Sequence, residues 1–179
     1  MPHVFSVSAR NGHGLGKTVC DEITLIAGEG VAGDAHCGAM VKHRSRVAKD
    51  PTQPNLRQVH MIHAELLGEL ADRGFVVAPG ELGENMLTQG LDLQGLATGT
   101  RLHIGDQVVV ELTGLRNPCN QINGHSPGLM DALLERANDG VLIRKGGVMG
   151  IVVTSGTVRA GDRVRVSEPL APKRALLPV

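Results

Sequence analysis

The cysteine in the stretch RNPCNQI, residues 116–122, has a polar setting that is unusual for a packing residue. Cys119 follows Pro118, whose ring fixes the neighbouring backbone, and Arg116 lies three residues upstream. A buried structural cysteine usually has apolar neighbours. A nearby cation favours the thiolate, which is the form that attacks electrophiles and binds soft metals. The residue types therefore favour a chemical role for Cys119 over a packing role.

Asp34 and His36 lie in the glycine-rich stretch GVAGDAHCG, residues 30–38. The aspartate could simply bond to its own backbone in a turn, with the histidine on the surface. Alternatively, Asp34 could orient and charge His36, while the paired glycines let the backbone approach a ligand closely. The residues by themselves leave both interpretations open.

A third polar segment, PGELGENM at residues 79–86, contains two carboxylates and an asparagine. Glu81 and Glu84 could act as an acid–base pair, but exposed glutamates are far commoner and the spacing alone decides nothing. Asn85 is more informative, because an asparagine that faces a pocket offers donors and an acceptor to a heterocycle.

The stretch NGHGLGKT, residues 11–18, resembles a nucleotide-binding P-loop but fails two of its requirements. Gly12 leaves three residues before Gly-Lys-Thr where the P-loop needs four, and Asn11 stands where the first glycine is required. The following segment does not begin a convincing helix to hold a phosphate. We therefore predict no P-loop here.

The charge balance excludes a protein-wide attraction to anionic partners. Lys plus Arg and Asp plus Glu number 18 each, so neither nucleic acid nor an anionic membrane is expected as a partner, and any anion site must be local. The only aromatic residues are Phe5 and Phe75, which argues against stacking platforms for bases.

The cysteines and the hydropathy pattern suggest a soluble cytoplasmic protein. Cys20, Cys37 and Cys119 form no CxxC pair, which argues against a disulfide framework or a structural zinc site. Neither an apolar run of membrane-spanning length nor a cleavable leader pattern is found. A length of 179 residues suits one domain, 1–179.

Short strands and glycine turns must position these polar segments. The pattern predicts strands over 4–8, 22–30, 101–114 and 147–166, and helices over 64–73 and 129–138. It also predicts an irregular loop over 38–57 and a surface tail over 168–179. Many short strands bury themselves best in a barrel, so we predict a mainly β fold, a barrel-like closed antiparallel sheet with a few short helices.

Six segments in order resemble the MOSC domain, the C-terminal domain of molybdenum cofactor sulfurases that also occurs as free-standing bacterial proteins. They span roughly residues 20–167, essentially the whole chain, and are GVAGDAHCG (30–38), QVHMIHAELLGEL (58–70), PGELGENM (79–86), GTRLHIGDQVVVELTG (99–114), RNPCNQI (116–122) and GGVMGIVVTSGTVRAGDRV (146–164). The resemblance implies a mainly β fold of the pyruvate-kinase-barrel-like type and a site for the molybdenum cofactor, a pterin that carries a phosphate and a dithiolene-bound metal.

The resemblance also implies roles for residues of these segments. Cys119 would be the reactive thiol, either as a ligand to molybdenum or as a carrier of sulfur. Arg116 and Asn117 would face the pterin or its phosphate, which an arginine can bind with a bidentate fork. His36 and Asn85 would line the same pocket, and Asp34 and Glu84 would orient them.

The function that this resemblance implies is an oxidoreductase that reduces N-hydroxylated small molecules. The alternatives are a sulfur carrier or cofactor chaperone that holds a persulfide on Cys119, and a vestigial binding module. The chain is too short for a pyridoxal-phosphate desulfurase domain and lacks a ferredoxin-like extension. It would therefore need an external electron donor or a cysteine desulfurase.

A separate candidate site for an anion is the basic loop that contains Lys42, His43, Arg44 and Arg46. The alternative is that this loop is simply solvated.

Overall fold

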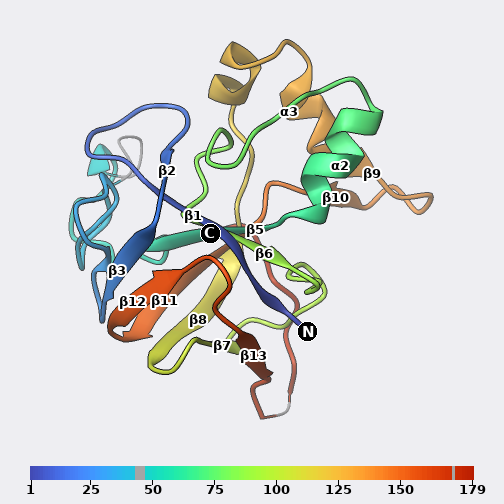
Figure 1. Ribbon diagram of the computed structural model, residues 1–179. Helices are drawn as coiled ribbons and strands as arrows, with labels where there is room; N and C mark the ends of the chain where they lie inside the picture. Colours follow the sequence, from blue (N-terminus) through green and yellow to red (C-terminus); the bar gives the residue numbers. More distant parts are fainter. Residues whose placement is uncertain (43–46, 171) are drawn as a thin grey trace.

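The structure is a computed structural model that describes residues 1–42, 47–170 and 172–179 (Figure 1). The strands of the largest sheet are β1 (His3–Ala9), β2 (Thr18–Cys20), β5 (Val59–His63), β6 (Met86–Gln89), β7 (Arg101–Ile104), β8 (Val108–Leu115), β11 (Val148–Thr154) and β13 (Val164–Ser167). The smaller sheets contain β3 (Glu22–Ile26), β4 (Gly30–Val31), β9 (Leu134–Arg136), β10 (Leu142–Arg144) and β12 (Gly156–Arg159). The helices are α2 (Glu65–Asp72), α3 (Leu129–Ala132) and the 3-10 helix η1 (Asn120–Gly124).

The largest sheet has the order β13-β7-β8-β11-β5-β6-β1-β2, and its neighbours are antiparallel except for the parallel pair β5–β6. A second sheet has the order β12-β3-β4, and β9 pairs with β10. The prediction of a mainly β fold with short helices is therefore confirmed.

The closed barrel that the sequence predicted is wrong. The edge strands β2 and β13 do not pair with each other. The segment around the start of β13 meets the start of β1 at a bridge between His3 and Arg163, where Val4 N–H donates to the Asp162 carbonyl and Val164 N–H donates to the Pro2 carbonyl. These contacts are short, and within the described residues β13 pairs along its length with β7 alone, so no continuous ladder joins the two ends. The sheet is consequently open in the described part of the chain.

Local patterning predicted several elements correctly. Residues Val108, Val110 and Leu112 are buried and alternate with less buried positions along β8, as expected for a strand with one face in the core. The turn before β8 contains Gly105 in the left-handed region, with φ of 57°. Helix α2 lies within the predicted 64–73 and buries Leu66 and Leu70.

The predicted helix 129–138 is too long, because it ends at Ala132 and Leu134–Arg136 pairs instead with β10. The described part of the tail 168–179 is mostly exposed, as predicted. It is also attached to the sheet: Leu115 N–H donates to the Leu177 carbonyl at 2.8 Å and Leu176 is buried. A tertiary partner decides both outcomes, which local propensity cannot anticipate.

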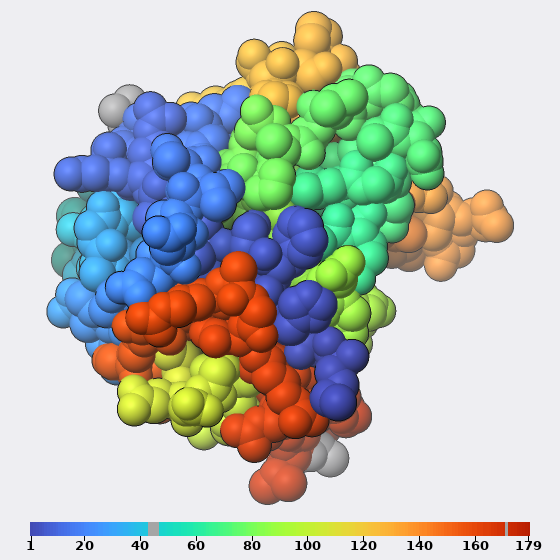
Figure 2. Space-filling view, in the orientation of Figure 1, coloured from blue at the N-terminus to red at the C-terminus, as the bar shows by residue number. Residues whose placement is uncertain are grey.

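The apolar core has two parts. One lies between the strands, and the other lies beneath α2 and α3, where Leu66, Leu70 and Leu129 pack together. Figure 1 shows α2, α3, β9 and β10 gathered at one side of the large sheet, and Figure 2 shows the segment around β9 and β10 standing out from the surface. None of the helices in the described ranges has the length and apolar character that crossing a bilayer requires.

Candidate functional site

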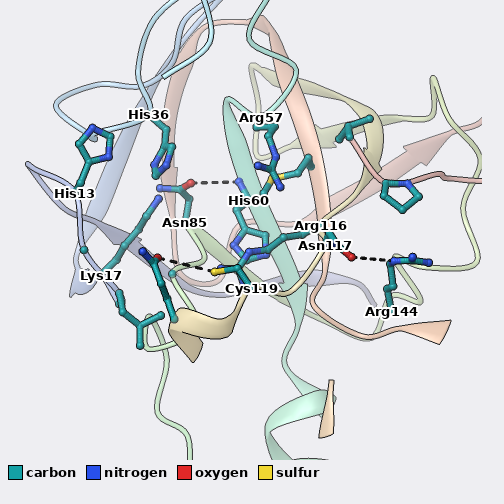
Figure 3. Close-up of a pocket in the computed structure, with 18 of the residues that line it drawn as sticks. His13, Lys17, His36, Arg57, His60, Asn85, Arg116, Asn117, Cys119 and Arg144 are labelled. Atoms are coloured by element: carbon teal, nitrogen blue, oxygen red, sulfur yellow. Dashed lines mark hydrogen bonds between the residues drawn. The ribbon is translucent and has the colours of Figure 1, made fainter. Parts of the chain in front are cut away.

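A cavity of about 810 Å³ lies where segments from distant parts of the sequence meet. Its wall contains five lysine or arginine side chains and, among the described residues, no aspartate or glutamate; the cations are Lys17, Lys49, Arg57, Arg116 and Arg144. Figure 3 shows Lys17 and His36 on one side and Arg116 on the other, with Cys119 between them in this view. Positive charge is thus concentrated in one place in a chain whose net charge is zero.

Cys119 lies in the cavity wall between the end of β8 and the start of η1. Its carbonyl accepts a hydrogen bond from Ile122 N–H at 3.1 Å, and its Sγ is 3.9 Å from Gln121 Oε1. The preceding Pro118 is buried against Gly146, where an added Cβ would lie 3.0 Å from the proline Cγ. The thiol is partly exposed on a backbone that is held in place.

Arg116 also lines the cavity, and its backbone N–H donates to the Gly147 carbonyl at 2.9 Å. Its Nη1 is enclosed and has no hydrogen-bond partner in the described part of the protein. Burial lowers the pKa of this guanidinium, while Cys119 and Glu84 act in the opposite direction. A buried donor without a partner is rare in native proteins, so this atom is a candidate contact for a ligand.

Lys17, Asp34 and His36 form a connected charged group. Lys17 Nζ lies 2.9 Å from Asp34 Oδ2, and the two side chains are 8% and 2% exposed. The other carboxylate oxygen, Oδ1, accepts the His36 backbone N–H at 3.1 Å and lies 3.4 Å from His36 Nδ1. Burial raises the pKa of Asp34, but the His36 hydrogen bond and the Lys17 charge outweigh this effect, so the pKa lies well below its ordinary value.

Asn85 lies behind the group formed by Lys17, Asp34 and His36 and is almost fully engaged with the protein. Its Nδ2 donates to Asp34 Oδ2 at 3.1 Å and to the Ser8 carbonyl at 3.2 Å, while its Oδ1 accepts the His60 N–H at 3.2 Å. It touches the cavity but is 2% exposed. A heterocycle would therefore find one remaining acceptor site on Asn85 and no free amide hydrogen.

Glu84 lies outside the cavity wall and is 1% exposed. Its Oε1 accepts the Gly80 N–H, and its Oε2 has no partner among the described residues. Burial raises the pKa of this carboxyl group, and the Gly80 hydrogen bond and nearby Arg116 limit the rise.

On the far side of the cavity, Asn117 Oδ1 accepts a hydrogen bond from Arg144 Nε at 3.0 Å.

The candidate residues from the sequence thus come together in one region. Cys119, Arg116, Asn117, His36 and Asn85 line the cavity, and Asp34 and Glu84 lie behind it. In the basic loop, His43, Arg44 and Arg46 lie outside the described residues, and Lys42 is exposed and not part of the cavity wall. Among the described residues no cluster of three or more His, Cys, Asp or Glu side chains could hold a metal ion.

The sequence did not single out several residues of the cavity wall, among them Lys17, His60 and the cations Lys49, Arg57 and Arg144. Lys17 belongs to NGHGLGKT, which does not fit a P-loop, and the signal that could have identified it is a lysine directly after a glycine-rich run. His60 lies among apolar residues on β5, is 4% exposed, and its Nε2 lies 2.7 Å from the Gly146 carbonyl. Burial and the charge of Arg116 place the pKa of His60 well below its ordinary value of 6.5.

The His60 pKa predicts a specific loss of stability in mild acid. Below pH 6.5 the unfolded chain takes up a proton at this residue and the folded chain does not, so the stability that His60 contributes above pH 6.5 declines as the pH falls. We expect the urea-unfolding free energy to decrease between pH 6.5 and 5 by up to about 1.4 kcal/mol per pH unit from this residue. His60→Gln should remove that part of the slope, whereas His103→Gln, away from the cavity, should retain it. An unchanged slope in His60→Gln would contradict the assignment.

Comparisons with known proteins identify the family. The family model for the MOSC domain matches residues 42–165. The YuaD protein from Bacillus subtilis has a similar fold, with a TM-score of 0.74 and 21% identity over 95% of this chain and 98% of that chain. YiiM from Escherichia coli gives a TM-score of 0.63 and 20% identity over 97% and 73% of the two chains.

YiiM from Geobacillus stearothermophilus gives a TM-score of 0.69 and 16% identity over 98% of this chain and 80% of that chain. A search of curated protein sequences gave no match. At these identities the solved structures show a shared fold, while the family model covers more than half of the sequence and includes the cavity residues from His60 to Met149. The chain therefore belongs to the MOSC domain family.

Proposed function

We propose that this protein binds the molybdenum cofactor in the cationic cavity and reduces N-hydroxylated small molecules. The observation that carries the proposal is the meeting of a partly exposed thiol, Cys119, with the enclosed and unpartnered Nη1 of Arg116 in one cavity. MOSC domains are associated with binding of this cofactor. The electrons would come from an external donor such as a reduced flavoprotein or iron–sulfur protein.

The residues of the cavity suit the chemistry of such a cofactor. A phosphate requires cationic donors, and Arg116 has a free one, with Lys49, Arg57 and Arg144 in the same wall. A soft metal centre prefers a thiolate, and Cys119 is the cysteine in the described cavity wall. When bound, the cofactor would supply the two-electron redox centre. The cavity residues would bind the anionic groups, orient the substrate and limit access of water.

Molybdenum content tests this proposal. The protein is purified from a host that makes the cofactor, and the metal per chain is measured by mass spectrometry for wild type, Cys119→Ala and Cys20→Ala. Cys20 is the matched control, because it is partly buried in β2 with its Sγ 3.7 Å from the Val7 carbonyl, outside the cavity. We expect metal in wild type and Cys20→Ala and at least about a tenfold lower content in Cys119→Ala, because the loss of one soft ligand removes much of the affinity.

Turnover of an aryl hydroxylamine with reduced methyl viologen is measured on the same samples. Equally low metal in wild type and Cys119→Ala would contradict cofactor binding by this cysteine. Metal without turnover would contradict the reductase activity and leave cofactor binding in place.

The alternative function is a sulfur carrier or cofactor chaperone, and the partial exposure of Cys119 supports it. A persulfide on a partly exposed thiol can be passed to a second protein, and the neighbouring cations stabilise its negative charge. Intact-mass measurement after incubation with a cysteine desulfurase and free cysteine tests this role. A sulfur adduct that is lost in Cys119→Ala supports the carrier, and no adduct together with turnover of a hydroxylamine excludes it.

A further inference from the structure

Reduction of an N-hydroxylated compound needs protons as well as electrons, and this inference rests on the proposed reductase function. For a hydroxylamine the balance is R–NHOH plus two electrons and two protons, giving R–NH₂ and water. The N–O bond breaks, and its oxygen leaves as water only if a proton reaches it inside the cavity. A group of the wall that gives up a proton near neutral pH would assist this step.

Several polar groups of the wall do not suit this task. Arginine side chains do not release protons in proteins, which excludes Arg57, Arg116 and Arg144. The pKa of buried His60 lies well below its ordinary value, so its imidazole is neutral, and the Nε2 that lies 2.7 Å from the Gly146 carbonyl holds its proton toward that oxygen. The thiol of Cys119 is reserved in the proposed function as the metal ligand.

Lys17 has the required position. Its side chain is 8% exposed, its Nζ contacts Asp34 Oδ2 at 2.9 Å, and the residue lines the cavity. Asp34 is the one hydrogen-bonding partner of Nζ within the described residues, so two of the three ammonium N–H groups have no acceptor there. The lysine is thus an anchored ammonium group at the cavity wall with hydrogen-bonding capacity to spare.

The backbone of Lys17 is also held tightly. Its N–H donates to the Gly80 carbonyl at 2.8 Å, and a Cβ on Gly80 would lie 2.3 Å from the Lys17 carbonyl oxygen. Gly80 has φ of 88°, which favours glycine. This close approach fixes the position from which the lysine side chain reaches the cavity.

Burial and neighbouring charges shift the pKa of the Lys17 ammonium group. Burial lowers the pKa of the ammonium group, and the charge of Arg116 acts in the same direction. The carboxylates of Asp34 and Glu84 oppose this effect, but the pKa remains lowered. A buried ammonium that is more acidic than a surface lysine and is paired with a carboxylate is better suited than a surface lysine to donate a proton.

We propose that Lys17 is the proton donor of this site, delivering a proton from Nζ to the hydroxyl oxygen of the substrate as the N–O bond breaks. The electron pair of that bond leaves with the oxygen, which becomes water, and the two electrons from the external donor replace the pair on nitrogen. Solvent supplies the second proton, to the nitrogen. Asp34 is a positioning residue that holds the amine, and His36, whose side chain is 33% exposed, joins Asp34 to solvent, from which Lys17 regains its proton.

Kinetics of cofactor-loaded variants test this role. We compare wild type, Lys17→Arg, Lys17→Gln and the matched control Lys145→Gln, which changes a lysine that is paired with Glu69 and Glu135 outside the cavity wall. At equal molybdenum content, Lys17→Arg and Lys17→Gln should each lower kcat about 100-fold with KM changed by no more than about threefold, since general acid catalysis typically contributes 100-fold or more. Lys145→Gln should stay within about threefold of wild type.

Wild-type kcat in Lys17→Arg would overturn the inference, because it would show that Lys17 serves only as a positive charge for an anion. A second measurement does not depend on the cofactor: NMR titration of ¹³C-labelled lysines in the cofactor-free protein, with Lys17→Gln used to assign the resonance. Titration of Lys17 clearly below the other lysines supports the inference, and titration together with them overturns it. Loaded wild type without turnover overturns the proposed function itself, whereas turnover that survives in Lys17→Arg overturns this inference alone.

Discussion

Replacing Asp34 with alanine is expected to lower the free energy of unfolding by about 3–5 kcal/mol at pH 7, the range typical for breaking a buried ion pair. The Asp34 carboxylate is 2% exposed and accepts bonds from the backbone N–H groups of Arg10 and His36 as well as from Lys17 and Asn85. Its removal leaves a buried ammonium and three other donors without an acceptor. Urea unfolding followed by circular dichroism measures the loss.

A second substitution separates the ion pair from the other contacts of Asp34. In Asp34→Ala with Lys17→Met no buried ammonium is left unpaired, so the double variant should be more stable than Asp34→Ala by at least about 1 kcal/mol. The pKa of Asp34 is lowered in the fold, so its contribution is fully present above its ordinary value of 3.8 and is lost as the pH falls below that value. A loss under about 1 kcal/mol at pH 7 would contradict the role of Asp34 as the centre of this network.

The second large effect is expected at Gly147, where alanine should lower the free energy of unfolding by about 2–5 kcal/mol. Gly147 has φ of 90°, and a Cβ there would lie 2.3 Å from the Met61 carbonyl oxygen and 2.6 Å from Ile62 Cγ1. The first contact is with backbone, so β5 and the start of β11 would have to separate. Because the same Cβ would lie 3.0 Å from His60 Nε2, the floor of the cavity would shift as well.

Gly161→Ala is the matched control for Gly147→Ala. Gly161 has a nearly equal φ of 92°, but a Cβ there would meet nothing within 4 Å. It should therefore show only the backbone strain, about 1–2 kcal/mol. Equal losses at Gly147 and Gly161 would show that the close approach of β11 to β5 does not limit stability.

The sequence predicted elements whose pattern is local. Apolar and polar residues alternate in 101–114, and the leucines of 64–73 recur at helical spacing. Each pattern indicates one buried face, so β8 and α2 could be identified without knowing their neighbours. The closure of the sheet could not be predicted in this way. It depends on how the start of β1 meets the segment before β13, and these two segments lie at opposite ends of the chain.

In the candidate site, too, some residues could be identified from their neighbours in the sequence and others could not. Cys119 could be selected because its polar neighbours lie beside it in the sequence, and the structure places it in the cavity wall. Lys17 could not be selected, since its burial depends on Gly80 and Asp34, which lie far along the chain. The packing of the last residues could not be predicted from the sequence either. The Leu177 carbonyl and the Val179 side chain fill the space that Gly114 leaves.

The long separations within the cavity determine when during biosynthesis a ligand can enter. Asn85 bonds to Ser8 and Asp34 across 77 and 51 residues, and Arg116 N–H donates to the carbonyl of Gly147, which directly precedes β11. A nascent chain that has left the ribosome only as far as β6 contains Lys17 and Asp34 but lacks the cysteine and the arginine. A ligand that contacts all of these side chains can therefore bind only after the chain has folded through Gly147, and such a ligand would shift the folding equilibrium toward the native protein by mass action.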